Sequence, residues 1–390
     1  MAKFPYQIGL LGGYHQHEKE LHETIERRFR DLGYAEDDFS ILCGDGVLDR
    51  ERRAPFAAIY FGHDQANEED PRALVDVLKD SAVVLPIVED ISSFSASVPV
   101  QIRHINGVQI DPDDPKFERD VGTIIENFRL LRKDRRLFIS YKRDDSRRIA
   151  LQLYEALDAR GFDVFLDTHG VPPGADFQAV LWHRLADSDV VVLLDTPNFF
   201  ESRWAREELT RANATSIQVL HLLWPGRSPP PEAALSSFLP LDEKDFRDSD
   251  FGGDGVLLDS VVKRIFVEVE GLRARALASR HRYLVDAFCD EARRLGVEVD
   301  VQPSRHIVFK GAESEGFVMP LVGVPSARRL HEVYEALFKE ESPKVVWALF
   351  DNRGLLSSTI DHLAWLNISL PLKAVSVYDV AKALGKEASE

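Results

Sequence analysis

The 390-residue sequence predicts an α/β protein made of three consecutive α/β units, the central one built on a parallel sheet. Short apolar segments alternate with segments whose apolar residues recur at helical spacing, which is the pattern of strands and covering helices. The length is typical of about two to three domains. A polar, proline-rich stretch from Pro225 to Gly255 interrupts the alternation and predicts a linker or a long excursion.

The N-terminal α/β domain is expected over residues 1–130. Gln7 to Leu11 is a short apolar strand, and Glu18 to Leu32 is an amphipathic helix that Gly33 can end. Ala82 to Val88 has few polar positions and predicts a buried strand. These elements favour a parallel sheet with helices packed on it.

The central unit is expected over residues 135–228. Its predicted strands are Leu137 to Tyr141, Asp163 to Leu166, Val190 to Leu194 and Gln218 to Leu223. Between the first two, Ile149, Leu153 and Leu157 recur at helical spacing, with Ser146 as the expected N-cap and Gly161 as the stop. The short connections are typical of a doubly wound sheet.

A linker and a connecting helix are expected over residues 229–279, followed by a C-terminal α/β domain over 280–390. One helix is predicted from Val256 to about Arg280 and a separate one from Tyr283 to Leu295. The C-terminal strand predictions are Val297 to Val301, Phe317 to Val324, Val345 to Phe350 and Lys373 to Val377, with helices starting near Ser326 and near Ser357. We interpret this last domain as a candidate sensor or assembly module.

A weak internal repeat relates the first two units. Leu78 to Val84 parallels Leu185 to Val191, and each lies between a predicted helix and a predicted strand. One interpretation is that the first unit is a degenerate copy of the second. The other is that helix-to-strand junctions in parallel sheets commonly share this pattern, and the sequence leaves both open.

Composition excludes some classes of partner. An apolar content of 44% predicts a folded protein, and a net charge of -17 disfavours direct nucleic-acid binding and attraction to anionic membranes. No apolar run reaches the roughly 20 residues of a membrane span, so a cytoplasmic location is expected.

Cysteine and histidine usage gives no recognised metal pattern. The two cysteines, Cys43 and Cys289, are too few for a disulfide framework or a cysteine-based zinc site. His15, His17 and His22 are expected to be surface residues, because no set of histidines and carboxylates around them matches a known ligand spacing. The sequence therefore predicts no metal and no bound cofactor.

Three motifs in the central unit carry a family resemblance. They are Phe138 to Arg143, Phe165 to Gly174 and Trp204 to Leu209, and in this order and spacing they resemble a TIR domain. The resemblance implies a flavodoxin-like fold, self-association through this domain, and NAD+ as a substrate that is cleaved at the nicotinamide ribose. It also implies a role as an immune or antiphage defence effector, activated by assembly and by a ligand or partner at the flanking domains.

The resemblance assigns roles to individual residues. Glu208 stands at the position of the family's catalytic glutamate, four residues after Trp204 and on the same predicted helical face, whereas Glu207 points elsewhere. The residues implied in substrate binding are Tyr141, Arg143, Asp167, Gly174, Phe177 and Trp204. Both a linear and a cyclic ADP-ribose product remain open. The alternative is a non-catalytic scaffold that recruits partners through the loop from Asp167 to Phe177.

Overall fold

The chain folds into two compact units, residues 1–133 and residues 134–390. The computed structural model describes residues 6–52, 54–64, 72–110, 117–166, 177–199, 217–230, 233, 236–302, 305–311, 315–338 and 345–387. Three five-stranded sheets lie in this described part, and the predicted α/β class is confirmed. None of its helices combines the length and apolar composition that a membrane span needs.

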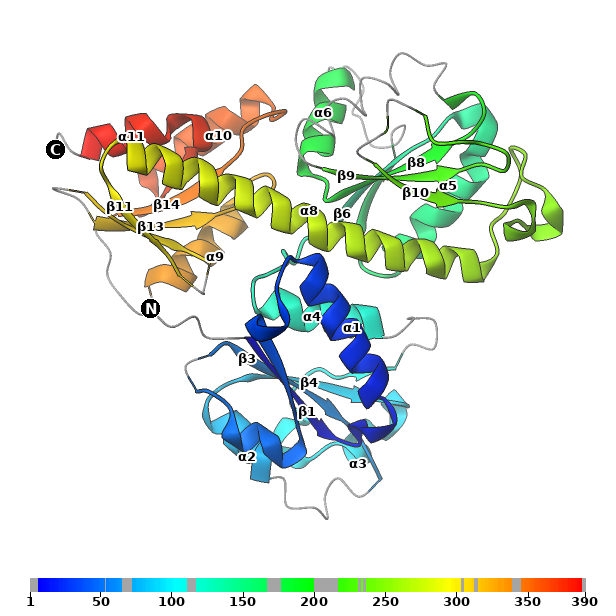
Figure 1. Ribbon diagram of the computed structural model, residues 1–390, viewed down its shortest axis with the longest axis horizontal. Coiled ribbons are helices and arrows are strands. Elements are labelled where there is room, and N and C mark those ends of the chain that lie inside the picture. The colour runs from blue at the N-terminus through cyan, green and yellow to red at the C-terminus, as the bar shows by residue number, and fades with distance from the viewer. Residues whose placement is uncertain are drawn as a thin grey trace. The chain divides into compact units, whose positions relative to one another are not determined.

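The N-terminal sheet of the first unit is parallel throughout. Its strands, in order across the sheet, are β2 (Phe39–Cys43), β1 (Tyr6–Gly12), β3 (Phe56–Phe61), β4 (Val83–Val88) and β5 (Val108–Gln109). The helices, drawn in blue to cyan in Figure 1, are α1 (Glu18–Asp31), α2 (Arg72–Lys79), α3 (Phe94–Ser97) and α4 (Glu118–Asn127). As predicted, α1 ends just before Gly33. Gly33 has a φ of 80°, a left-handed conformation that glycine adopts more easily than other residues.

The central sheet of the second unit is also parallel. Its strands, in order across the sheet, are β10 (Ser237–Pro240), β9 (Gln218–Leu223), β8 (Val190–Asp195), β6 (Arg136–Ser140) and β7 (Asp163–Leu166). Helices α5 (Arg143–Asp158) and α6 (Phe177–Asp187) belong to it. All six residues of β8 are buried, as expected for an inner strand covered on both faces.

The central sheet and the helix after it extend beyond the domain boundaries expected at residues 228 and 280. Strand β10 lies in the segment expected as a linker and adds a fifth strand beside β9. The two expected helices are one helix of 36 residues, α8 (Asp259–Arg294), the long yellow helix in Figure 1. Its first half buries Ile265, Phe266 and Val269 in the core of the central sheet, and it also packs against strands of the C-terminal sheet. These parts therefore share one compact unit.

The C-terminal sheet is mixed. Its strands, in order, are β11 (Glu298–Val301), β12 (Ile307–Lys310), β13 (Glu315–Pro320), β14 (Val345–Phe350) and β15 (Lys373–Ser376). The first three pair antiparallel and the last three parallel. Its helices are α9 (Ala327–Phe338), α10 (Ser357–Ser369) and α11 (Val380–Glu387). Phe288 of α8 closes its core against Phe309 and Trp347.

A kink at Ser146 divides α5 into a short first turn and a longer helix. The helix begins at Arg143, and Ser146 sits inside it as a kink with φ of -152° and ψ of 23°. Its backbone N–H donates to the Lys142 carbonyl at 3.1 Å. A short helical turn therefore precedes the predicted start, and Ser146 lies at the junction between this turn and the rest of α5.

The repeated segments do not occupy equivalent places. Numbered from its own first strand, the central sheet has the same strand order as the N-terminal sheet, with the second strand outside the first and the third to fifth on its other side. However, Leu78–Val84 leads into the fourth strand of its sheet, and Leu185–Val191 into the third. The similarity between the two segments thus reflects the common junction of helix and strand. The shared strand order of the two sheets does not depend on it.

Candidate functional site

The candidate site lies at the carboxyl ends of β6 and β8. From β6 the chain passes to β7 on one side and then to β8 on the other, so the strand order reverses between β6 and β8. Open α/β sheets bind ligands at such a switch point, outside the carboxyl ends of the strands. The loops after β6 and after β8 border this position.

A carboxylate joins the two loops. Asp145, in the first turn of α5, accepts a hydrogen bond from the Thr196 hydroxyl at 2.9 Å and one from the Asn198 amide at 3.3 Å. Lys142 Nζ donates to the Asn198 carbonyl at 3.3 Å. The loop after β6 is therefore held against the loop after β8. Sequence reasoning missed Asp145, Thr196 and Asn198, because their approach depends on β6 and β8 being neighbours.

A buried acid supports the same edge. Asp195, the last residue of β8, is fully buried, and one oxygen lies 3.2 Å from Nδ1 of His221 on β9. Its other oxygen accepts from the Arg227 guanidinium at 2.8 Å. A buried carboxylate is stable only with such partners. We interpret Asp195 as support for the loop Thr196–Asn198.

Comparison with known proteins identifies the central part of the chain. A family model described as TIR domain matches residues 137–254. The chain contains a TIR domain. The match begins at the second residue of β6 and extends beyond β10, so it includes the fifth strand of the central sheet.

The other comparisons are weaker. A family model for protein-L-isoaspartate(D-aspartate) O-methyltransferase matches residues 14–101, in the first unit. The TIR domains of the activated Roq1 resistosome that directly recognizes the pathogen effector XopQ are 17% identical, with 37% of this chain and 84% of that chain covered and a TM-score of 0.23. Tagatose-6-phosphate ketose/aldose isomerase from Escherichia coli is 13% identical, with 72% and 84% covered and a TM-score of 0.20. At these TM-scores neither structure supports a conclusion about this chain. The search of curated proteins gave no match.

Two of the predicted site residues lie in the described loop after β6 of the TIR domain. Arg143 is exposed at the first position of α5, where its charge and the helix N-terminus both favour an anion. Tyr141 is only 5% exposed and belongs to the apolar core with Ile149 and Leu153. Stacking on a base would require its ring to leave these contacts, so a binding role for Tyr141 stays a prediction.

The other predicted site residues are not placed. Phe177 is the first residue of α6, but only its backbone is described. Asp167, Gly174, Trp204 and Glu208 lie outside the described residues. The last described residue before Trp204 and Glu208 is Phe199, which is 3% exposed and donates its N–H to the Thr196 carbonyl. The segment carrying Glu208 thus departs from the loop that Asp145 holds.

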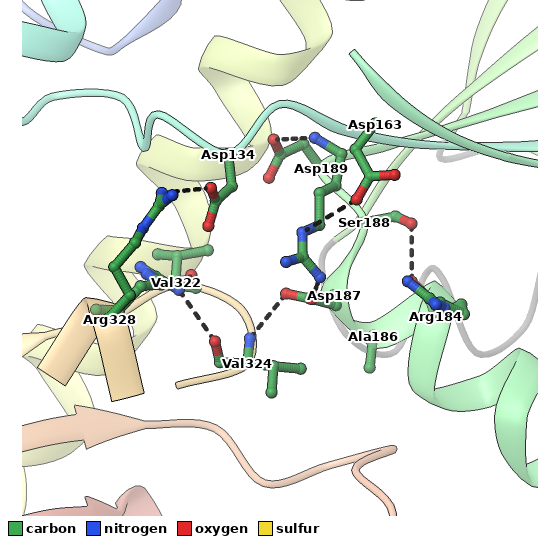
Figure 2. A network of polar contacts seen from close by, with 12 residues as sticks. Asp134, Asp163, Arg184, Ala186, Asp187, Ser188, Asp189, Val322, Val324 and Arg328 are labelled. Carbon is green, nitrogen blue, oxygen red and sulfur yellow. Dashed lines mark hydrogen bonds and ion pairs between the residues drawn. The ribbon is translucent and has the colours of Figure 1, made fainter. Parts of the chain in front are cut away.

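The amino-terminal edge of the TIR sheet contacts the loop after β13 and the helices α8 and α9. Asp187, just before β8, accepts from the Val324 backbone N–H at 2.8 Å (Figure 2). The same carboxylate pairs with Arg136. Arg328 of α9 pairs with Asp134 at 2.8 Å in the same view. Arg280 of α8 adds bonds to the Ser188 and Ala186 carbonyls. These bonds fix the amino ends of β6 and β8 and leave their carboxyl ends to the candidate site.

Arg135, the residue before β6, links the TIR sheet to α8. Arg135 is 9% exposed, forms an ion pair with Glu270 of α8 and lies over the Phe162 ring at 4.7 Å. Its guanidinium therefore holds α8 against the TIR sheet.

Proposed function

We propose that the TIR domain cleaves NAD+ between nicotinamide and ribose, with Glu208 as the catalytic carboxylate. The observation that carries the proposal is the pair of loops held together by Asp145 at the switch point of a TIR sheet. One loop presents Arg143, and the other leads into the segment with Trp204 and Glu208.

The reaction needs only one carboxylate. In NAD+ the pyridinium nitrogen is already positive, so it takes the electron pair of the breaking C1′–N bond and leaves as neutral nicotinamide without a general acid. The ribose carbon becomes oxocarbenium-like, and an anion beside the ring stabilises that charge. Water then attacks C1′ and releases its proton to solvent, which gives ADP-ribose. Attack by an adenine nitrogen of the same molecule gives the cyclic product.

Arg143 binds the substrate in this proposal. The guanidinium matches the oxygens of a pyrophosphate, and the α5 N-terminus adds its partial positive charge. Phosphate binding at this point places the nicotinamide ribose farther along the edge, toward the loop after β8. Binding energy from the unreactive pyrophosphate then positions the reacting carbon.

We further propose that this reaction serves as a cytoplasmic defence response that depends on TIR self-association. Its support is the family resemblance and the continuous α8, which joins the TIR core to a second sheet within one unit. A ligand or partner bound elsewhere on the chain acts by changing how TIR domains assemble.

The test is NAD+ consumption by the purified full-length chain, followed by separation of nicotinamide, ADP-ribose and cyclic ADP-ribose. We expect nicotinamide release that rises more than linearly with protein concentration, because assembly limits the rate. Absence of release at all concentrations, with and without a crowding agent, would favour the alternative of a scaffold without turnover.

A further inference from the structure

Three metal-binding side chains converge at the carboxyl edge of the N-terminal sheet, outside the TIR domain. They are Glu18 and His22 of α1 and Cys43 at the end of β2. The Cys43 sulfur lies 3.7 Å from Glu18 Oε1 and 3.8 Å from His22 Nε2. One donor atom from each of the three residues lies within 4.8 Å of the other two.

The fold, and not the local sequence, creates this cluster. Glu18 and His22 are one helical turn apart, so their side chains lie on the same face of α1. Strand β2 runs parallel to β1 with Cys43 beside Leu10, which brings the end of β2 next to the start of α1. Such an edge of a parallel sheet is where α/β folds commonly place ligands.

The spacing of the donors fits a tetrahedral ion. Bonds of about 2.3 Å from zinc to sulfur and about 2.1 Å to nitrogen or oxygen, at the tetrahedral angle, place the sulfur about 3.6 Å from each of the other two donor atoms. The two measured separations from the sulfur, 3.7 and 3.8 Å, are close to this value. Thiolate, imidazole and carboxylate together are a typical zinc donor set.

A nucleophilic triad explains the cluster less well. In a triad the base contacts the nucleophile and an acid orients the base, whereas here Glu18 and His22 both approach the sulfur.

We propose that Glu18, His22 and Cys43 bind one zinc ion, with the fourth coordination position open to water. All three side chains are half-buried, so the ion can reach them from solvent. Three protein ligands and one exchangeable position are the arrangement of zinc sites that perform chemistry, whereas structural sites use four protein ligands. The site is therefore a reactive or sensing centre in the first unit.

The test is titration of the reduced, metal-free, full-length chain with Co²⁺, using a preparation without a histidine tag. We expect one equivalent to bind and to produce the near-ultraviolet thiolate-to-cobalt charge-transfer band, which Zn²⁺ then displaces. Cys43→Ser should abolish the band. Loss of even an outer-shell partner costs about 10- to 100-fold in metal affinity, so His22→Gln should weaken binding at least about tenfold.

Cys289→Ser is the matched control, since Cys289 is the other half-buried cysteine and lies on α8 in the second unit. It should keep the band and the affinity. Absence of the band in wild-type protein that is folded by circular dichroism would overturn the proposal. An unchanged band in Cys43→Ser, or equal loss in Cys289→Ser, would overturn it as well.

Discussion

The N-terminal sheet and the TIR sheet share one strand order but carry different chemistry at their carboxyl edges. The TIR edge has an exposed arginine and a carboxylate that holds two loops together, which suits an anionic substrate. The N-terminal edge has a thiol, an imidazole and a carboxylate around one point, which suits a metal ion. The difference shows that a doubly wound sheet supplies the place for a site, while a few side chains decide its chemistry.

The largest expected loss of stability comes from a substitution in the first unit, and it tests whether the two units unfold separately. Glu118 of α4 is 1% exposed and accepts from Arg28 Nε at 2.7 Å, with Arg27 on its other oxygen. Glu118→Gln removes the buried carboxylate charge that Arg28 and Arg27 share and leaves Arg28 paired with Asp31, so we expect a loss of about 3 kcal/mol in the unfolding free energy of the first unit, the lower end of the cost of breaking a buried ion pair. Denaturant unfolding should show an earlier transition for that unit alone.

Glu23→Gln is the matched control for Glu118, because Glu23 is on α1 with a side chain 51% exposed. It should cost less than about 0.5 kcal/mol. A parallel shift of both transitions in Glu118→Gln would show that the two units do not unfold independently.

A smaller effect is expected from a substitution that lowers activity at the edge of the TIR sheet and leaves metal binding at the edge of the N-terminal sheet unchanged. Asp145→Ala removes the acceptor of Thr196 and Asn198, so the loops after β6 and β8 lose their common partner. We expect NAD+ turnover to fall about 10- to 100-fold, as for a displaced catalytic group, while Co²⁺ binding in the first unit stays unchanged. Asp144→Ala, at the exposed neighbouring position, should keep turnover within about twofold. Unchanged turnover in Asp145→Ala would place the reaction elsewhere.

The smallest effect concerns acid stability of the second unit. Burial lowers the pKa of His281 on α8 well below its ordinary value, and the charge of Arg305 acts in the same direction. Above about pH 6.5 the side chain is neutral in both the folded and unfolded states, so its contribution to stability is fully present. Below that pH the unfolded chain binds a proton that the folded chain does not, and stability falls by up to about 1.4 kcal/mol per pH unit.

Unfolding measured from pH 7.5 to 5 should therefore show a shallower acid loss in His281→Gln than in wild type. His331→Gln, at a side chain 67% exposed, should keep the wild-type slope. Equal slopes in all three proteins would mean that His281 titrates normally in the folded state. The transition of the first unit should not respond to either substitution.

Much of the fold could be predicted from apolar patterning. The strand predictions at 163–166, 218–223 and 345–350 match β7, β9 and β14, because buried parallel strands are short apolar runs with clear ends. Strand β10 was missed since it follows a proline-rich stretch. Helix α8 was expected as two helices, one ending near Arg280 and one starting at Tyr283, whereas the Arg280 side chain lies within one helix and binds two carbonyls of the TIR domain.

The sites were harder to predict than the fold. The family resemblance pointed to Tyr141 and Arg143, but not to Asp145, whose role depends on β6 and β8 being neighbours. His22 was expected at the surface, and Cys43 was considered only together with Cys289. Their approach follows only from β2 lying beside β1, a pairing that single-sequence patterns do not specify.

The most direct test of the account compares two adjacent glutamates in the full-length chain. Glu208→Gln removes the negative charge that the proposed transition state needs, whereas Glu207→Gln makes the same change one residue earlier. With both variants as stable as wild type, we predict that initial NAD+ cleavage falls at least about 100-fold in Glu208→Gln, the scale of one lost electrostatic catalytic group. It should stay near wild type in Glu207→Gln. Equal activity in the two variants, whether retained or lost, would contradict the assignment of Glu208 as the catalytic carboxylate.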